Sequence, residues 1–306
     1  MACRPLQELN RNLLSPPAQM VATRMDGLAV AGAVKERVAT AVADLRGRGT
    51  SPCLATVLVG DDAASATYVR NKHKACEATG ILTRDHRLPA STTQGELDAV
   101  IDTLNSEAAV HGILVQLPLP QQVDEFAATS RILPPKDVDG LTPYSAGMLA
   151  VRRPVLAPCT PSGIIEMLDH YGIDVPGRRV SIINRSNLIG KPLSQMLLAR
   201  DATVTMCHSR TRDIARHTRD ADIVVSAVGD RSRFELRPDM VAEGAVVIDA
   251  AIQRHEGKLA GDADYGPMSE RASHLTPVPG GVGPMTVAML LKNTVTAASM
   301  IANVGT

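Results

Sequence analysis

The sequence is poor in aromatic residues and has no excess charge of either sign. It has no tryptophan and only 2% aromatic residues, so aliphatic side chains and methionine must fill its cores, for which 44% hydrophobic content is sufficient. Lys plus Arg total 32, as do Asp plus Glu, and no basic stripe appears. We therefore expect no nucleic-acid partner. No uninterrupted apolar run reaches membrane-spanning length, so we expect no membrane partner either.

The cysteine pattern argues against a disulfide or zinc framework. The five cysteines are odd in number and form no Cys-x-x-Cys pair: Cys3, Cys53, Cys76, Cys159 and Cys207. Such spacing is typical of reduced, mostly buried thiols in a cytoplasmic protein. No His, Cys and acidic residues stand at ligand spacing, so no metal is predicted.

The order of apolar segments predicts an α/β fold with two domains. Residues 1–24 carry three arginines against one acid, which indicates a disordered or over-extended tail, with a transit peptide as the other interpretation. From Met25 onward, short apolar strands alternate with helices, a pattern typical of parallel sheets covered on both faces. We predict a first domain over 25–142, a Rossmann-like second domain over 143–287, and a final helix over 288–306.

A strand–loop–helix segment, VSIINRSNLIGKPLSQMLLA at 180–199, has the context of a dinucleotide site. Its loop has one glycine, Gly190, and fits neither the Walker pattern nor G-x-G-x-x-G. An ordinary turn is therefore the competing interpretation. The next strand ends in CHSR, residues 207–210, without the acidic residue that usually binds the ribose of NAD. Four side chains near the two strand ends could bind a 2′-phosphate and so favour NADP: Arg185, Ser186, Ser209 and Arg210. Simple exposure of these side chains to solvent is the alternative interpretation.

One lysine lies on the unexpected face of a predicted helix over 64–79. On a helical wheel Lys72 falls between Cys76 and Thr79, whereas His73 falls on the polar face. A snorkelling lysine is one interpretation, and a partly desolvated lysine suited to proton transfer is the other. Tyr68, one turn earlier, would offer a flat surface to a ring.

Two loops are richer in special residues than simple connections need. VQLPLPQ at 115–121 follows a strand end, where substrate sites gather in parallel sheets. TPVPGGVGPMT at 276–286 combines prolines, which stiffen it, with glycines, which let backbone approach a ligand.

Together these segments resemble the bifunctional methylenetetrahydrofolate dehydrogenase/cyclohydrolase family. TYVRNKHKAC resembles the family's Y-V-x-x-K helix, and NRSNLIGKP resembles its nucleotide loop. VQLPLP, KDVDG, PCTPSG and TPVPGGVGPMT match its signatures nearly letter for letter. The resemblance implies a homodimer of two-domain chains, a cleft between the domains, and a final helix that returns to the first domain.

The resemblance also implies an activity and its residues. NADP would oxidise 5,10-methylenetetrahydrofolate to the methenyl form, which is then hydrolysed to 10-formyltetrahydrofolate. Lys72 would be the acid/base of hydrolysis, Gln116 would orient it, Tyr68 would stack on the folate and Asp139 would bind the pterin. The implied substrate contacts also include Val115, Leu117, Pro279, Gly280, Gly281, Val282 and Gly283. The implied cofactor contacts are Asn184, Arg185, Ser186, Gly190, Ser209, Arg210 and Ile252.

Two departures from the family lie near the nucleotide, since Asn184 and Ala251 each replace a glycine. Asn184 either keeps a left-handed turn, which asparagine tolerates, or crowds the cofactor. We favour the turn, because the following loop residues keep the family spacing. A cyclohydrolase with weakened dehydrogenase activity, a non-catalytic folate-binding homologue and a non-folate dehydrogenase are the alternative functions.

Overall fold

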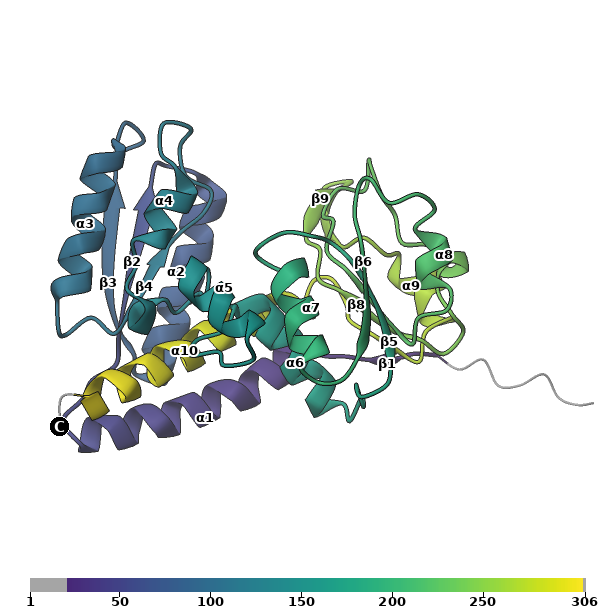
Figure 1. The fold of residues 1–306 in the computed structure, drawn as a ribbon, viewed down its shortest axis with the longest axis horizontal. Helices are drawn as coiled ribbons and strands as arrows, with labels where there is room; N and C mark the ends of the chain where they lie inside the picture. The colour runs from purple at the N-terminus through teal and green to yellow at the C-terminus, as the bar shows by residue number, and fades with distance from the viewer. Residues whose placement is uncertain (1–20, 305–306) are drawn as a thin grey trace, which may run out of the picture.

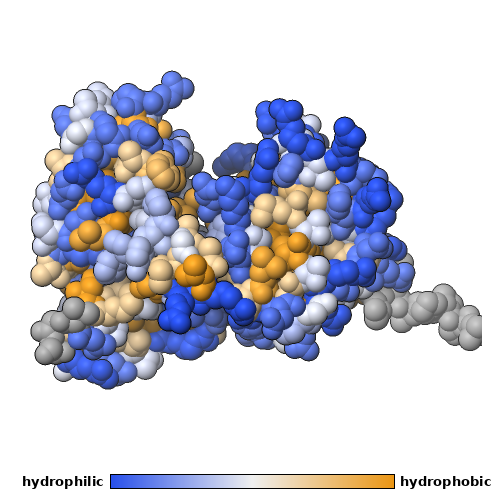
Figure 2. All heavy atoms as spheres, viewed as in Figure 1, coloured by the Kyte–Doolittle hydropathy of each residue, from blue (hydrophilic) through white to orange (hydrophobic). Residues whose placement is uncertain are grey.

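A computed structural model describes residues 21–304, so most of the predicted tail lies outside the described residues. Two lobes, each built on its own parallel sheet, stand side by side (Figure 1). The α/β fold class predicted from the sequence is confirmed. Between the lobes the surface is hollowed (Figure 2).

The first lobe is a three-stranded parallel sheet in the order β3-β2-β4. Its central strand, β2, is buried along its whole length because every side chain in CLATVLV except Thr56 is apolar. The lobe comprises β2 (Cys53–Val59), α2 (Ala63–Thr79), β3 (Leu82–Leu88), α3 (Gln94–Ser106), β4 (Gly112–Val115), α4 (Glu125–Ser130) and the 3-10 turn η1 (Pro134–Lys136).

The second lobe is a six-stranded parallel sheet in the order β1-β11-β8-β7-β5-β6. Its strands are β1 (Thr23–Arg24), β5 (Arg179–Ile183), β6 (Thr203–Cys207), β7 (Ile223–Ser226), β8 (Val246–Asp249) and β11 (His274–Leu275). Its other elements are α5 (Pro143–Ala150), α6 (Cys159–His170), α7 (Gly190–Leu198), α8 (Ala215–Thr218), η2 (Pro238–Met240), α9 (Tyr265–Ser269) and the antiparallel hairpin β9 (Gln253–His255) and β10 (Lys258–Ala260). β1 pairs with β11, so Thr23 and Arg24 belong to this sheet and not to a tail.

The helices nearest the two chain ends connect the lobes. α1 (Gly27–Gly47) and α10 (Val282–Val304) run side by side from the junction of the lobes along the underside of the first lobe, and α10 also packs on α6, α2 and β4 (Figure 1). α10 therefore begins before the predicted residue 288. By length and composition alone its stretch Val282–Asn303 could cross a membrane, but half of that stretch is buried in the protein core.

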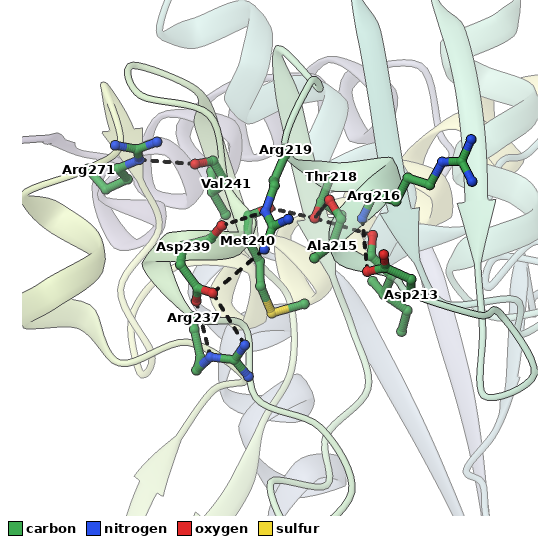
Figure 3. A network of polar contacts seen from close by, with 11 residues as sticks. Asp213, Ala215, Arg216, Thr218, Arg219, Arg237, Asp239, Met240, Val241 and Arg271 are labelled. Atoms are coloured by element: carbon green, nitrogen blue, oxygen red, sulfur yellow. Dashed lines mark hydrogen bonds and ion pairs between the residues drawn. The ribbon is translucent and has the colours of Figure 1, made fainter.

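Arginines on the outer side of the second lobe hold its short elements together (Figure 3). Arg219 donates to the carbonyl of Asp239 at 2.9 Å, and Arg271 donates to the carbonyl of Val241 at 3.0 Å. Thr218 adds a bond of 2.5 Å to the carbonyl of Met240. These bonds fasten α8 and α9 to the turn η2, so this basic cluster is part of the scaffold.

The start of α1 lies against the loop at 276–286. Gly27 donates its N–H to the carbonyl of Gly280 at 2.9 Å. A Cβ at Gly27 would lie 1.8 Å from the carbonyl oxygen of Gly281, closer than any real contact. Only glycine therefore lets the first turn of α1 support this loop.

Gly27→Ala should displace the 276–286 loop and destabilise the protein by about 1–3 kcal/mol, because backbone has to move to admit the methyl group. Gly32→Ala is the matched control on the same helix, since a Cβ there meets nothing within 4 Å. That change should stabilise by about 0.5–1 kcal/mol through helix propensity. Urea unfolding measures both, and a Gly27→Ala protein as stable as wild type would contradict the contact.

Candidate active site

Helix α2 is fixed at both ends, which sets the direction of its side chains. The Asp62 carboxylate accepts from the N–H of Ser65 at 2.7 Å, and Gly80 ends the helix with φ 81°. Lys72 is half-buried on the side of Cys76 and Thr79, which are both buried. Tyr68, one turn earlier, is 47% exposed and open to a ligand.

The position of His73 differs from the predicted polar face. Its Nε2 lies 2.8 Å from the Thr56 hydroxyl in the buried centre of β2. The sheet is only three strands wide, so the flank of α2 next to His73 also packs on it. The helical wheel had placed this flank on the solvent-exposed face.

A hydrogen bond joins the predicted acid/base to its predicted partner. The Lys72 Nζ donates to the Gln116 Oε1 at 3.0 Å. Gln116 follows the end of β4, and its own Nε2 donates to the carbonyl of Leu117 at 2.7 Å. That second bond fixes the amide so that its oxygen faces the ammonium. The peptide between Leu117 and Pro118 is cis.

The groups around Lys72 are neutral thiols and one carboxyl. Burial raises the pKa of the Cys76 thiol to about 12, and burial with the nearby Asp139 raises the pKa of the Cys159 thiol well above its usual value. Neither thiol is therefore a thiolate nucleophile at neutral pH. Withdrawal from water raises the pKa of the Asp139 carboxyl, and the positive charge of Lys72 opposes that shift.

The KDVDG loop that carries Asp139 is held by two buried charges. The Lys136 ammonium donates to the three carbonyls of Leu104, Asn105 and Glu107, at 2.9, 2.8 and 2.7 Å. Burial lowers the pKa of Lys136. The buried Asp137 carboxylate accepts from the backbone N–H of Leu141 and Thr142 and, at 2.6 Å, from the Ser145 hydroxyl.

Asn293 connects α10 to two loops at the site. Its Nδ2 donates to the carbonyls of Val138 and Ala157, both at 2.8 Å. The Cys159 thiol also donates to the Val138 carbonyl, at 3.3 Å. The sequence analysis missed Asn293, Lys136 and Asp137. The position of Asn293 as a polar residue within an apolar helix was the available signal.

The predicted substrate loop follows β11 and leads into α10. Its Val278–Pro279 peptide is cis, and Gly280 has φ 100°, a value that favours glycine. Thr276 anchors the loop to β8, since the Asp249 N–H donates to its hydroxyl at 2.7 Å. Thr286 lies 2.9 Å from the Thr160 hydroxyl. Among the described residues, no hydrogen bond or ion pair joins this loop directly to Lys72 or Gln116.

The predicted cofactor residues follow the carboxyl ends of neighbouring strands. Ile183 at the end of β5 pairs with Cys207 at the end of β6, so Arg185 and Ser209 each lie two residues beyond paired positions. They therefore share one edge of the sheet, as a dinucleotide site requires. The exposed residues on this edge are Arg185, Ser209, Arg210 and Ile252. In the described chain, the Arg185 side chain makes no internal hydrogen bond or ion pair.

The left-handed turn favoured for Asn184 is wrong. The described non-glycine residues with positive φ are Arg152, Asp201, Asp213 and Glu256. Asn184 instead uses its side chain. Its Oδ1 accepts from the N–H of Ser186 at 2.7 Å and of Gly190 at 3.0 Å, and its Nδ2 donates to the Ala227 carbonyl at 2.7 Å. The loop still presents the exposed Arg185 side chain to a cofactor, and Gly190 packs closely on the Asn184 backbone.

Two buried carboxyls shape the neighbouring loops, and sequence reasoning missed both. Asp262 accepts from the Ser226 hydroxyl at 2.5 Å and from the N–H groups of Val228 and Gly229. Asp249 accepts from the N–H groups of Ala251 and Ala263. Burial, assisted by Asp262, raises the pKa of Asp249 to about 6.

This raised pKa predicts a pH dependence of stability. Below about pH 4 the Asp249 carboxyl is protonated in both the folded and the unfolded chain. The unfolded chain ionises first as pH rises, so the stabilising contribution is lost through the folded pKa of about 6. The loss is about 2–3 kcal/mol. Between about pH 4.5 and 7.5, wild type should therefore lose urea stability relative to Asp249→Asn; a constant difference would refute the shift.

Among the described residues, no group of three or more His, Cys, Asp and Glu side chains is arranged to hold a metal ion. What the fold does provide is a dinucleotide-type sheet edge in one lobe and a half-buried lysine bonded to a glutamine in the other. These features define a two-lobed α/β enzyme that uses a dinucleotide.

Comparison with known proteins identifies the family. The catalytic domain of the tetrahydrofolate dehydrogenase/cyclohydrolase family matches residues 25–139, and its NAD(P)-binding domain matches residues 158–302. The chain is 59% identical over 286 residues to the bifunctional protein FolD of Nitrosopumilus maritimus, covering 94% of this chain and 100% of the relative. It is 63% identical over 277 residues to FolD of Cenarchaeum symbiosum, covering 90% and 98%. The chain belongs to the tetrahydrofolate dehydrogenase/cyclohydrolase family.

Solved structures agree with this assignment. The bifunctional enzyme FolD of Campylobacter jejuni has a TM-score of 0.87 at 45% identity, covering 91% of this chain and 99% of that one. FolD of Trypanosoma brucei, complexed with NADP and an inhibitor, has a TM-score of 0.86 at 42% identity, covering 91% and 98%. The resemblance predicted from the sequence motifs is confirmed.

Proposed function

We propose that this chain oxidises 5,10-methylenetetrahydrofolate with NADP and hydrolyses the methenyl product to 10-formyltetrahydrofolate. The observation that carries the proposal is the hydrogen bond between Lys72 and Gln116, at 3.0 Å, beside the exposed ring of Tyr68. Family membership and the full-length match to bifunctional relatives support the pairing of the two reactions.

In the first reaction the residues of this chain bind and orient. NADP would supply the hydride acceptor when bound, and the residues that would hold it are Asn184, Arg185, Ser186, Gly190, Ser209, Arg210 and Ile252. The folate ring stacks on Tyr68, and the Asp139 carboxyl hydrogen-bonds the pterin. Burial raises the pKa of Asp139, and its carboxyl oxygens can accept hydrogen bonds from the ring N–H groups. Val115, Leu117 and the loop Pro279–Gly283 enclose the substrate and exclude water.

In the second reaction Lys72 moves protons. Water adds to the methenyl carbon, and both of its protons leave the added oxygen. One proton is released, because the methenyl substrate carries a positive charge, and the other ends on N5 as the bond from that carbon to N5 breaks. An amine beside the carbon can accept the first proton and return one to N5. Gln116 is an acceptor for the ammonium and fixes its position. The neutral Cys76 and Cys159 thiols do not compete as nucleophiles.

The second candidate is a cyclohydrolase with weakened dehydrogenase activity. The Asn184 side chain favours it, because it occupies N–H groups inside the nucleotide loop. NADPH formation by the purified protein separates the two candidates, since only the bifunctional enzyme reduces NADP when given methylenetetrahydrofolate.

We also propose that the enzyme is a cytoplasmic homodimer. Reduced thiols support the compartment, because Cys53, Cys76, Cys159 and Cys207 are free and buried. The dimer follows from the family resemblance. We also propose a first domain over 25–142 with most of the folate contacts, and a second over 143–287 with the NADP contacts and the substrate loop Pro279–Gly283.

Lys72→Met should abolish most hydrolysis of methenyltetrahydrofolate, by roughly 10²–10⁴-fold, because general acid–base catalysis contributes about this much. Hydride transfer needs no protein proton donor, so dehydrogenation should fall less. Lys74→Met is the control, since Lys74 is exposed on the same helix. Separate assays of each reaction decide, and equal loss of both in a folded Lys72→Met protein would count against the assignment.

Arg185→Ala should weaken NADP binding by roughly ten- to a hundredfold, because a charged hydrogen bond to a phosphate is worth about 1.5–3 kcal/mol. NAD has no 2′-phosphate, so its affinity should barely change. Parallel calorimetric titrations with both cofactors measure this. A matching loss for NAD would show that Arg185 supports the loop and does not select the phosphate.

A further inference from the structure

Several backbone N–H groups of the nucleotide loop donate to acceptors within the same loop. The Asn184 Oδ1 accepts from two of them, on Ser186 at 2.7 Å and on Gly190 at 3.0 Å. The Ser186 hydroxyl and carbonyl accept two more, from Ile189 and Lys191, both at 3.1 Å. Four loop N–H groups are therefore bonded within the loop itself.

The bond from the Gly190 N–H to Asn184 bears on cofactor binding. It is the first residue of α7, and the first N–H groups of a helix at this place in a Rossmann-like fold normally face a pyrophosphate. A glycine at position 184 would have no side chain to accept from Gly190. The Asn184 Nδ2 is also anchored, by its bond of 2.7 Å to the Ala227 carbonyl at the end of β7. The carboxamide is therefore held between two strand ends.

We propose that Asn184 lowers cofactor affinity by occupying donors that would otherwise bind the pyrophosphate, which NADP and NAD share. Cofactor affinity then depends on the side chains that reach the 2′-phosphate, Arg185, Ser209 and Arg210, and NAD binds poorly because it lacks that phosphate. The inference rests on the proposed use of NADP. It makes Asn184 a residue that sets cofactor affinity through the loop backbone.

The test compares Asn184→Gly and Asn184→Ala with wild type by calorimetric titration of NADP, NAD and 2′,5′-ADP. Both variants free the N–H groups of Ser186 and Gly190. NADP and NAD share the pyrophosphate, so both should bind about tenfold more tightly, as one charged hydrogen bond gained would give. 2′,5′-ADP has no pyrophosphate and should change little. Asn184→Ala separates the lost carboxamide from the flexibility of glycine.

Asn187→Ala is the matched control in the same loop, because the Asn187 side chain contacts only the Lys191 Nζ, at 2.8 Å. It should leave all three affinities unchanged. Hydrogen exchange of the cofactor-free protein gives an independent readout. The N–H groups of Ser186 and Gly190 should be protected in wild type and exchange faster in both Asn184 variants.

Weaker or unchanged binding of NADP and NAD by both Asn184 variants would overturn the inference and make Asn184 a simple loop brace. Equal tightening of 2′,5′-ADP would also overturn it, because the pyrophosphate would then not be involved. Variants that bind NADP when wild type does not would support the inference while contradicting the proposed dehydrogenase activity. Absence of NADP binding in every protein would overturn both.

Discussion

The packing of α1 against α10 is the constraint on which the rest of the structure depends. These helices join the lobes, and both begin beside the loop at 276–286. At one end, Gly27 supports the substrate loop through a contact that admits no side chain. Along α10, Asn293 holds the two loops that flank Asp139. Neither lobe holds all the proposed contacts, so catalysis depends on the helix pair that aligns them.

The two proposed reactions depend on different kinds of interaction. In the proposed mechanism, hydrolysis depends on the Lys72 amino group, which is hydrogen-bonded to Gln116 and lies near neutral thiols. Oxidation depends on geometry, because the protein only has to place the folate carbon against the cofactor. In the nucleotide loop, the Asn184 side chain already accepts from two backbone N–H groups, and the arginine side chains at the loop surface are free.

Sequence patterns predicted the long elements well and the short or paired ones poorly. A continuous apolar run is typical of a buried strand such as β2. Helical periodicity predicted α2 and the position of Lys72 on its apolar side. The predicted domain boundary between 142 and 143 falls at the start of a helix that was not predicted, since Pro143 begins α5 and the first turn of a helix tolerates proline. β1 and β11 have two residues each, too few for a pattern. The roles of Asn293 and Asp249 depend on partners distant in sequence, and Asn184 fills its loop with a side chain, which backbone rules for glycine did not predict.

The most direct test of the account is to give purified wild type each substrate separately and follow each product. With methylenetetrahydrofolate and NADP, the account predicts NADPH and 10-formyltetrahydrofolate in equal final amounts. With methenyltetrahydrofolate alone, it predicts hydrolysis without any cofactor. Hydrolysis of the methenyl substrate with no NADPH from the methylene substrate would contradict the central claim that this chain performs both reactions.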